Sequence, residues 1–231
     1  MAANQDLYNT QADRYDLLIA HEDYQQNILP ALNQIHPLAG LNVVELGAGT
    51  GRLTCLLAPI VKSIRAFDAA QAMLEVAMAK LRRMPLQNWT IGVADHRNLP
   101  IKAQSADLVI SGWSICYTVV YHPEHWREEL GKVLAEMKRV LRPRGTIILL
   151  ETQGTGHETP HPPEKLAKYY RYLEAKEGFS STWIRTDYQF PSLAEAESLV
   201  RFFFGDTLAD QTVQEKWVIL PECTGIWWLT L

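Results

Sequence analysis

The sequence has few cysteines, and their spacing argues against both a disulfide-stabilised protein and a zinc-binding domain. Its 231 residues include 3 cysteines, Cys55, Cys116 and Cys223, which stand far apart and form no C-x-x-C pair. Such spacing indicates neither a disulfide framework nor a zinc site, and it fits a reducing compartment. We therefore expect no bound metal.

The chain also lacks a basic excess, an apolar leader and a long apolar run. Its formal net charge is -4, from 22 Lys and Arg against 26 Asp and Glu. Proteins that bind a phosphate backbone carry a basic surface, so nucleic acid is not an expected partner. The N-terminus, MAANQDLYNTQADRYD, is polar, and no apolar run is long enough to cross a bilayer. We expect a cytoplasmic protein without a membrane partner.

What the sequence does contain is an alternation of short apolar runs with amphipathic helical patterns over residues 41–151. The runs are NVVEL, SIRAFD, WTIGVAD, ADLVISG and GTIILLE. Consecutive apolar positions are typical of strands that are covered on both faces. Strand–helix repetition predicts a parallel sheet with right-handed crossovers, so the predicted fold class is α/β with a doubly wound sheet.

Four segments are expected along the chain. They are an N-terminal helical cap at 1–36, a ligand-binding core at 37–151, a substrate-cap insertion at 152–190, and a helix with a hairpin that completes the core sheet at 191–231. In the last segment, Ser192 and Glu195 have the spacing of a capping box. Apolar runs on both sides of PECTG predict a terminal antiparallel hairpin.

A glycine-rich turn follows the first predicted strand, with glycines at Gly47, Gly49 and Gly51. Doubly wound sheets bind ligands at such a turn, because the backbone can approach closely and the helix N–H groups are free. The dinucleotide fingerprint is G-x-G-x-x-G, whereas here the third glycine comes one residue early. Glu45 lies on the same side of the strand as Gly47 and would repel a pyrophosphate. A nicotinamide oxidoreductase is therefore the disfavoured alternative, and a ligand with a cationic amine is favoured.

S-adenosylmethionine has such an amine, together with a carboxylate, a ribose and an adenine. Asp68 ends the second predicted strand about twenty residues after the turn, where an acidic residue typically accepts both ribose hydroxyls. Asp95 ends the third predicted strand at the same sheet edge and suits the adenine amino group. Glu45, Asp68 and Asp95 are therefore expected to hold the amine, the ribose and the adenine.

Five stretches in order resemble the class I S-adenosylmethionine-dependent methyltransferases, in particular their small-molecule branch. They are VVELGAGTGRLT, FDAAQAMLEVA, VADHRNLPI, ADLVISGWSICY and RVLRPRGTIILLE. The N-terminal YNTQADRYDLL resembles the helix that lies over the cofactor in many such enzymes. The resemblance implies a mostly parallel, seven-stranded Rossmann-like sheet whose antiparallel strand comes from the C-terminal hairpin. It also implies transfer of a methyl group from S-adenosyl-L-methionine to a small molecule, with S-adenosyl-L-homocysteine as product.

The expected cofactor-binding residues lie at the ends of the predicted strands and in the N-terminal helix. They are Tyr8, Tyr15, Glu45, Gly47, Ala48, Gly49, Gly51, Arg52, Asp68, Ala69, Met73, Asp95, His96 and Ser111, and the substrate-pocket candidates are Trp113, Tyr117 and Tyr188. Alternatives stay open for several of them, and Tyr188 either walls a pocket or fills a core. Arg52 either pairs with an acidic neighbour or touches the cofactor, Met73 packs in the core or against the cofactor, and His96 covers the adenine or is solvated.

No catalytic residue is assigned from the sequence. In-line methyl transfer needs alignment in a dry site, so a side-chain base is not obligatory. His122 and His125 are candidate bases, but their context is more typical of an exposed helix start. The chemical identity of the acceptor, the atom that is methylated and the oligomeric state stay open. A non-catalytic S-adenosylmethionine-binding regulatory or scaffold protein on the same fold is the alternative function.

Overall fold

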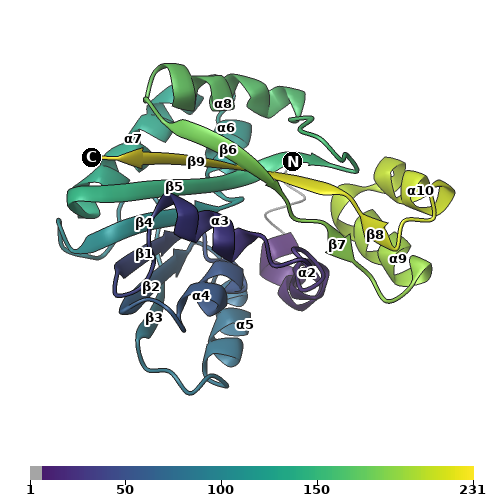
Figure 1. Ribbon diagram of the computed structural model, residues 1–231, viewed down its shortest axis with the longest axis horizontal. Coiled ribbons are helices and arrows are strands. Elements are labelled where there is room, and N and C mark those ends of the chain that lie inside the picture. The colour runs from purple at the N-terminus through teal and green to yellow at the C-terminus, as the bar shows by residue number, and fades with distance from the viewer. Residues whose placement is uncertain (1–6) are drawn as a thin grey trace.

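The computed structural model describes residues 7–231, which form a central sheet with helices on both faces (Figure 1). The strands of this sheet are β1 (Asn42–Leu46), β2 (Ser63–Asp68), β3 (Trp89–Val93), β4 (Ala106–Gly112), β5 (Leu141–Thr155), β6 (Ser180–Arg185) and β9 (Glu222–Thr230). A separate two-stranded sheet contains β7 (Tyr188–Gln189) and β8 (Ile219–Leu220). Each of the five apolar runs of the core therefore forms a strand.

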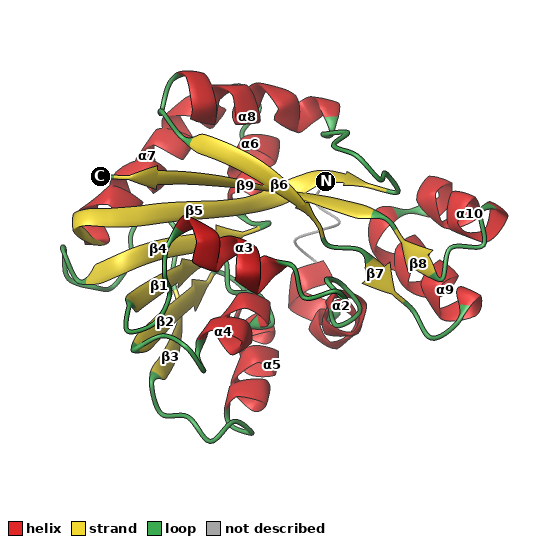
Figure 2. Ribbon diagram, viewed as in Figure 1, coloured by secondary structure: helices red, strands yellow, loops and turns green. Residues whose placement is uncertain are grey.

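Helices connect the strands and cover the sheet. They are α2 (Ala12–Ile19), α3 (Ile28–Ile35), α4 (Arg52–Leu57), α5 (Gln71–Leu81), α6 (Ile115–Tyr121), α7 (Trp126–Val140), α8 (Glu164–Ala175), α9 (Leu193–Phe204) and α10 (Asp206–Gln214). Figure 2 shows α3 and α4 on one face of the main sheet, and α6, α7 and α8 toward the other. Among residues 7–231, we find no helix with the length and apolarity that a membrane crossing requires.

The order of strands in the main sheet is β3-β2-β1-β4-β5-β9-β6. Parallel pairs join β1 to β2 and β4, β2 to β3, and β4 to β5. Strand β9 runs antiparallel to both of its neighbours, β5 and β6. The predicted doubly wound, mostly parallel sheet with an antiparallel C-terminal strand is confirmed.

Alternation along the central strands divides the core into two layers. Val43 packs in a cluster with Leu53 and Leu57 of α4, on one face of the sheet. Its neighbour Val44 packs in the opposite cluster with Leu130 and other residues of α7. Successive side chains of a strand point to opposite faces, so a strand covered on both sides must be apolar at consecutive positions. Full burial of such a side chain contributes about 1.5–3 kcal/mol.

The predicted terminal hairpin is wrong in its pairing, because the runs around PECTG do not pair with each other. Ile219 and Leu220 pair with β7, whereas β9 lies between β5 and β6. Leu220 is buried with Tyr188 in a small cluster outside the main sheet, and Trp227 is buried in the main core. The two runs thus bury their side chains in different clusters, which separates them.

Residues 152–190, expected as a substrate cap, contribute mainly to the sheet and its cover. Strand β6 forms the edge of the sheet, and α8 buries Tyr169 and Leu173 in the main core. A smaller unit made of β7, α9, α10 and β8 lies beside α2 instead (Figure 1). The 191–231 segment is therefore divided between this unit and β9. That residues 152–190 select the substrate stays a prediction.

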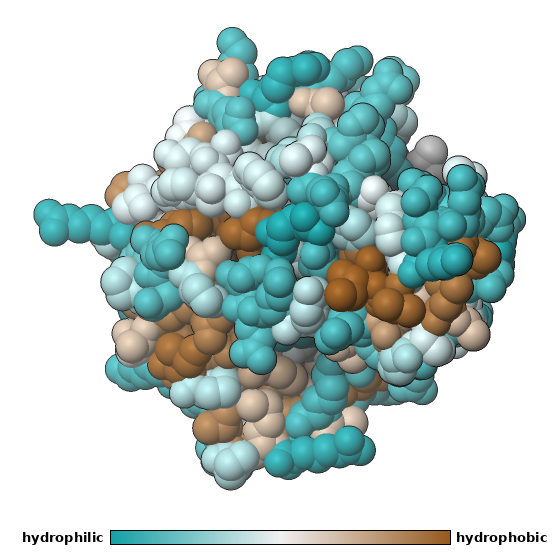
Figure 3. Space-filling model, turned by 45° about the vertical axis from the view of Figure 1, so that its right-hand side comes forward, coloured by the Kyte–Doolittle hydropathy of each residue, from teal (hydrophilic) through white to brown (hydrophobic). Residues whose placement is uncertain are grey.

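The smaller unit begins with the predicted capping box. The Ser192 side chain accepts a hydrogen bond from the Glu195 backbone N–H at 3.2 Å, at the start of α9. Exposed apolar side chains of this region include Val213, Val218 and Ile219. On the face shown in Figure 3, apolar patches are interrupted by hydrophilic residues.

Candidate functional site

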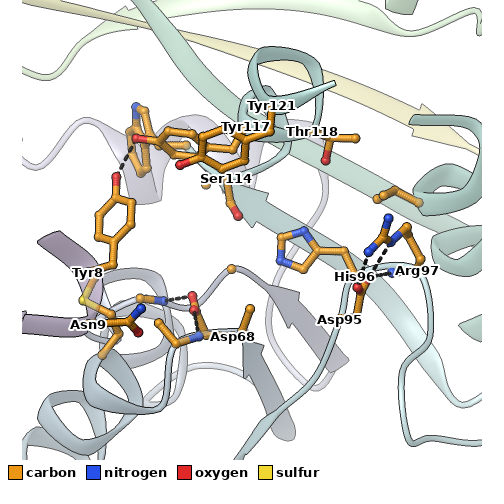
Figure 4. Close-up of a pocket in the computed structure, with 18 of the residues that line it drawn as sticks. Tyr8, Asn9, Asp68, Asp95, His96, Arg97, Ser114, Tyr117, Thr118 and Tyr121 are labelled. Carbon is orange, nitrogen blue, oxygen red and sulfur yellow. Dashed lines mark hydrogen bonds and ion pairs between the residues drawn. The ribbon is translucent and has the colours of Figure 1, made fainter. Parts of the chain in front are cut away.

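A cavity of about 330 Å³ lies at the carboxyl ends of β1, β2, β3 and β4. Doubly wound sheets bind ligands at this edge, and a volume of this size suits a small molecule. The structure brings most of the predicted site residues to its walls. They are Tyr8, Tyr15, Gly47, Gly49, Asp68, Ala69, Met73, Asp95, His96, Trp113 and Tyr117. Figure 4 shows Asp68 on the glycine-turn side of the cavity and His96 across from it.

The glycine turn brings bare backbone to the cavity wall. Gly47 has φ +70°, and a Cβ atom added there would overlap the Ser114 side chain. Gly51 has φ +83°, and its Cβ would lie 2.9 Å from the Ala77 Cβ. Left-handed backbone of this kind favours glycine. Gly47 is therefore required for the approach of α6 to the turn, whereas Gly51 is required for the packing of α4 against α5.

The Asp68 carboxylate is held by two backbone N–H groups. Gly49 N donates to Asp68 Oδ2 at 2.8 Å, and Ala70 N donates to Asp68 Oδ1 at 2.8 Å (Figure 4). A carboxylate oxygen can accept more than one hydrogen bond. Both oxygens of Asp68 thus keep capacity for hydroxyl groups of a ligand in the cavity.

The Asp95 carboxylate is fixed by its neighbour Arg97. Arg97 Nη2 lies 2.5 Å from Asp95 Oδ2, and Arg97 Nε donates to Asp95 Oδ1 at 2.8 Å. These side-chain hydrogen bonds lower the pKa of Asp95 to about 2, so it is ionised at neutral pH. Burial lowers the pKa of His96, which favours the neutral imidazole. Because His96 lines the cavity and is half-buried, the structure favours contact with a ligand over full solvation.

Aromatic side chains close another side of the cavity. The hydroxyl oxygens of Tyr8 and Tyr117 are 2.5 Å apart (Figure 4). The Tyr8 ring meets Tyr15 edge-on at a centroid distance of 5.4 Å, and Tyr117 stacks on Tyr121 at 5.4 Å. The segment before α2 and helix α6 therefore meet over the cavity. Electron-rich aromatic rings attract cations such as a sulfonium.

Six predicted residues do not line the cavity: Glu45, Ala48, Gly51, Arg52, Ser111 and Tyr188. Glu45 is buried and accepts a hydrogen bond from Thr54 Oγ1 at 2.6 Å. Burial raises the pKa of Glu45 to about 8. This carboxylate is therefore turned toward α4, and the expected contact of Glu45 with the ligand amine stays a prediction. Ser111 is also buried and donates to the Leu46 carbonyl at 2.8 Å.

Arg52 and Tyr188 belong to a neighbouring buried group. Arg52 Nη1 lies 2.5 Å from Glu22 Oε2, and the Tyr188 hydroxyl donates to the same oxygen at 2.9 Å. The Arg52 guanidinium also lies over the Trp113 ring, 3.9 Å from its centroid. Of the two alternatives for Arg52, the structure shows pairing with an acidic neighbour. For Tyr188 it shows packing outside the cavity with Phe190.

Several lining residues were not singled out from the sequence. They are Asn9, Arg97, Gly112, Ser114, Thr118 and Val133. Ser114 and Thr118 lie beside Tyr117 and Tyr121 along α6 (Figure 4). This spacing of three and four residues is the signal that could have identified one helix face directed toward the ligand.

The sequence matches a family model described as a methyltransferase domain over residues 44–149. Over these residues, which make up less than half of the chain, the sequence is similar to that family. This chain is 29% identical over 154 residues to the demethylmenaquinone methyltransferase of Lactococcus lactis subsp. lactis, covering 64% of this chain and 58% of that protein. It is 24% identical over 198 residues to an uncharacterised methyltransferase of Bacillus licheniformis, covering 84% and 85% of the two chains. This chain therefore spans less than two thirds of the lactococcal relative.

Among solved structures, this chain resembles phosphoethanolamine N-methyltransferase 2 of Haemonchus contortus in complex with S-adenosyl-L-methionine. The TM-score is 0.61 with 15% sequence identity, over 97% of this chain and 59% of that chain. At this identity the likeness concerns the fold. The fold predicted from the five stretches is confirmed, and the match to a methyltransferase domain over residues 44–149 agrees with the predicted family.

Proposed function

We propose that the chain is an S-adenosylmethionine-dependent methyltransferase that acts on a small-molecule acceptor. The observation that carries the proposal is the Asp68 carboxylate, which two backbone N–H groups hold beside the glycine turn in a cavity at the carboxyl edge of the sheet. The similarity of residues 44–149 to a methyltransferase domain supports the same conclusion.

In this proposal, the cofactor extends along the carboxyl edge of the sheet. Asp68 accepts the ribose hydroxyls, and the adenine lies near Asp95, His96 and Met73. The methionine end lies against the glycine turn and the tyrosines of the N-terminal segment. Hydrogen bonds to a charged acceptor contribute about 1.5–3 kcal/mol each, so Asp68 is expected to contribute strongly to affinity.

When bound, the cofactor supplies a methyl group on a cationic sulfonium. The residues of this chain contribute alignment and exclusion of water, which are the main requirements of an in-line displacement. Tyr8 and Tyr117 close the cavity through their hydroxyl groups. Burial raises the pKa of Tyr8, so its hydroxyl stays neutral and acts as a hydrogen-bonding group. We assign no general base.

The acceptor is proposed to be a small molecule whose carbon frame packs on aromatic side chains. Trp113, Tyr117 and Tyr121 all line the cavity, and aromatic rings bind apolar or cationic groups. The lactococcal relative is named for a small-molecule acceptor, which supports this class of substrate. We also propose a cytoplasmic location and no nucleic-acid partner, on the basis of the net charge of -4 and the free cysteines.

One feature favours the alternative of a non-catalytic cofactor-binding protein. Next to the cavity, Trp113 packs against Arg52, which pairs with the buried Glu22, so side chains fill this side. An intact cofactor site without a productive acceptor site would behave as a sensor or scaffold.

A thermal-shift experiment with S-adenosylhomocysteine and NAD tests the cofactor class. A ligand at a hundred times its dissociation constant stabilises the fold by about 2.7 kcal/mol. We expect S-adenosylhomocysteine to raise the Tm by several degrees and NAD to leave it unchanged. The reverse result would contradict the proposal. Transfer of label from S-adenosylmethionine into a metabolite extract then separates the enzyme from the sensor.

A further inference from the structure

Helix α6 forms one wall of the cofactor cavity, and the end of β5 holds the start of this helix. The side chains that α6 presents to the cavity include Tyr117, Thr118 and Tyr121 (Figure 4). Glu151 of β5 is 1% exposed and makes hydrogen bonds to α6 and α8 on one face of the sheet. The wall of the cavity therefore depends on a buried side chain that is not among the cavity-lining residues.

The Glu151 carboxyl group joins α6 and α8 to β5. Its Oε1 accepts a hydrogen bond from Cys116 N at 2.9 Å and one from the Tyr169 hydroxyl at 3.3 Å. Within residues 7–231, its buried Oε2 makes no hydrogen bond. Both hydrogen bonds go to one oxygen atom, so a proton on the other oxygen leaves them intact. A buried carboxyl group is costly where an apolar side chain would fit, so its presence points to the groups that it holds.

The first turn of α6 takes its hydrogen-bond acceptor from outside the helix. The first N–H groups of a helix have no partner within it. In the described part of the chain, the side chain of Ser114, which precedes α6, makes no capping hydrogen bond. Glu151 supplies the acceptor for Cys116 N instead. The start of this short helix is therefore fixed by β5 rather than by its own cap residue.

The residue chain that leads into α6 is held by the same end of β5. Trp113 has φ +51°, a left-handed backbone conformation that bulky residues rarely adopt. Its N–H donates to the Leu150 carbonyl at 2.7 Å, and its side chain lines the cavity. Strained backbone persists where the surrounding contacts hold it. Leu150 and Glu151 thus hold two nearby points of the segment that enters the cavity wall.

The position of α6 sets the shape of the cavity near the glycine turn. A Cβ atom at Gly47 would overlap the Ser114 side chain, so the start of α6 packs directly on the turn. About one turn further along, the Tyr117 hydroxyl oxygen lies 2.5 Å from that of Tyr8. The proposed function has the methionine end of the cofactor at both of these contacts. A displacement of α6 would change both at once and would therefore weaken cofactor binding.

We propose that Glu151 is a positioning residue, whose Oε1 holds the first turn of α6 and thereby places Ser114 and Tyr117 for cofactor binding. This inference rests on the proposed function and goes beyond it, because it assigns a role to a residue that does not touch the cofactor. The requirement is an acceptor at the place of Oε1, whatever the charge of the group. Glu151→Gln keeps such an acceptor in its amide oxygen, whereas Glu151→Met has only a weakly accepting thioether.

Calorimetry with S-adenosylhomocysteine tests this role. We expect Glu151→Met to bind about tenfold more weakly than the wild type, which is the effect of about one lost hydrogen bond. Glu151→Gln should rescue binding to within about threefold of the wild type. Hydrogen exchange locates the cause, because in Glu151→Met the amides of α6 should exchange at least about tenfold faster than in the wild type.

The matched control is Val140→Ala, which opens a cavity in the core at the end of α7. Val140 is buried directly before β5, at the sheet edge opposite to the cofactor cavity. Thermal unfolding should show that Val140→Ala is destabilised. Its affinity for S-adenosylhomocysteine and the hydrogen exchange of α6 should match the wild type, because the start of α6 stays in place.

The inference is overturned if Glu151→Met keeps wild-type affinity, or if Glu151→Gln or Val140→Ala loses as much affinity as Glu151→Met. Glu151→Leu is the second variant should Glu151→Met not fold. Failure of both to fold would also overturn the inference, because Glu151 would then act on the fold as a whole. Failure of the wild-type protein to bind S-adenosylhomocysteine would instead contradict the proposed function, so the two failures are distinguished.

Discussion

Two pairs of carboxylates in the central sheet have opposite surroundings. In the half formed by β1 to β4, Asp68 and Asp95 line an open cavity, held by backbone N–H groups or by an arginine. In the half formed by β5, β9 and β6, Glu151 and Glu222 are buried, and each has an oxygen atom without a hydrogen bond from residues 7–231. Burial raises their pKa values to about 7 and about 8.

This difference distinguishes a preformed site from a closed one. In the first half, Asp68 and Asp95 are held at the cavity wall, where they can accept hydrogen bonds from hydroxyl or amino groups of a ligand. The second half favours protonated carboxyl groups, because an ionised carboxylate in a dry environment is costly. The cavity edge therefore offers a ligand carboxylates that the fold already holds in place.

The largest expected effect concerns the glycine turn of the first half. In Gly47→Ala, the added Cβ overlaps the Ser114 side chain at a φ of +70°. We expect a loss of stability of about 2–5 kcal/mol and no measurable cofactor binding. Urea unfolding and calorimetry with S-adenosylhomocysteine measure both effects.

The matched control is Gly131→Ala in α7, where an added Cβ meets no atom within 4 Å. This change should stabilise the fold by about 0.5–1 kcal/mol, because alanine is the better helix former. If Gly47→Ala were as stable as the wild type and bound S-adenosylhomocysteine equally well, the turn would not be a tight contact.

Asp68→Asn is expected to weaken the binding of S-adenosylhomocysteine about tenfold to a hundredfold. The amide cannot accept equally from two backbone N–H groups and two ribose hydroxyls. Calorimetry measures the affinity, and thermal unfolding checks the fold. Glu75→Gln on the exposed face of α5 is the control and should bind as the wild type does. Equal affinities of the Asp68 variant and the wild type would place the ribose elsewhere.

A smaller effect concerns the half formed by β5, β9 and β6, where the pH dependence of stability reports on Glu151. Burial raises the pKa of Glu151 from 4.5 to about 7, so the folded state holds a proton that the unfolded state releases. Its contribution to stability is fully present below about pH 4.5 and is lost as the pH rises through about 7. Between pH 5 and pH 8, the Tm of Glu151→Gln should therefore fall by less than the Tm of the wild type. The exposed Glu128→Gln should follow the wild-type profile. A Glu151→Gln profile parallel to that of the wild type would mean that this carboxyl group titrates normally.

The smallest effect concerns the unit beside α2. Ser192→Ala removes the hydrogen bond from Glu195 N at the start of α9 and should cost about 1 kcal/mol of stability. Cofactor affinity should not change, because none of the cavity-lining residues comes from α9. Urea unfolding and calorimetry measure the two quantities. A tenfold loss of affinity would show that this unit supports the cofactor site.

The sequence allowed prediction of the features that depend on local pattern. Consecutive apolar residues predicted the strands, and the spacing of Ser192 and Glu195 predicted a helix start. Asp68 could be predicted as a lining residue because strand ends in a parallel sheet share one edge. These inferences need only neighbouring residues and the geometry of one repeated unit.

Features set by distant contacts could not be predicted in the same way. The pairing of Arg52 with Glu22 joins residues thirty positions apart, and β9 pairs with β5 rather than with the run that precedes it. Alternation along β1 placed Glu45 on the side of Gly47, but a hydrogen bond from Thr54 holds its carboxylate toward α4. Each of these outcomes depends on which surfaces meet after the chain has folded.

A crystal structure of the protein with S-adenosylhomocysteine tests the central claim most directly. The account predicts the ribose hydroxyls within hydrogen-bond distance of Asp68 and the adenine beside Asp95 and His96. Density for a dinucleotide diphosphate at the glycine turn, or a homocysteine derivative bound away from Asp68, would contradict it.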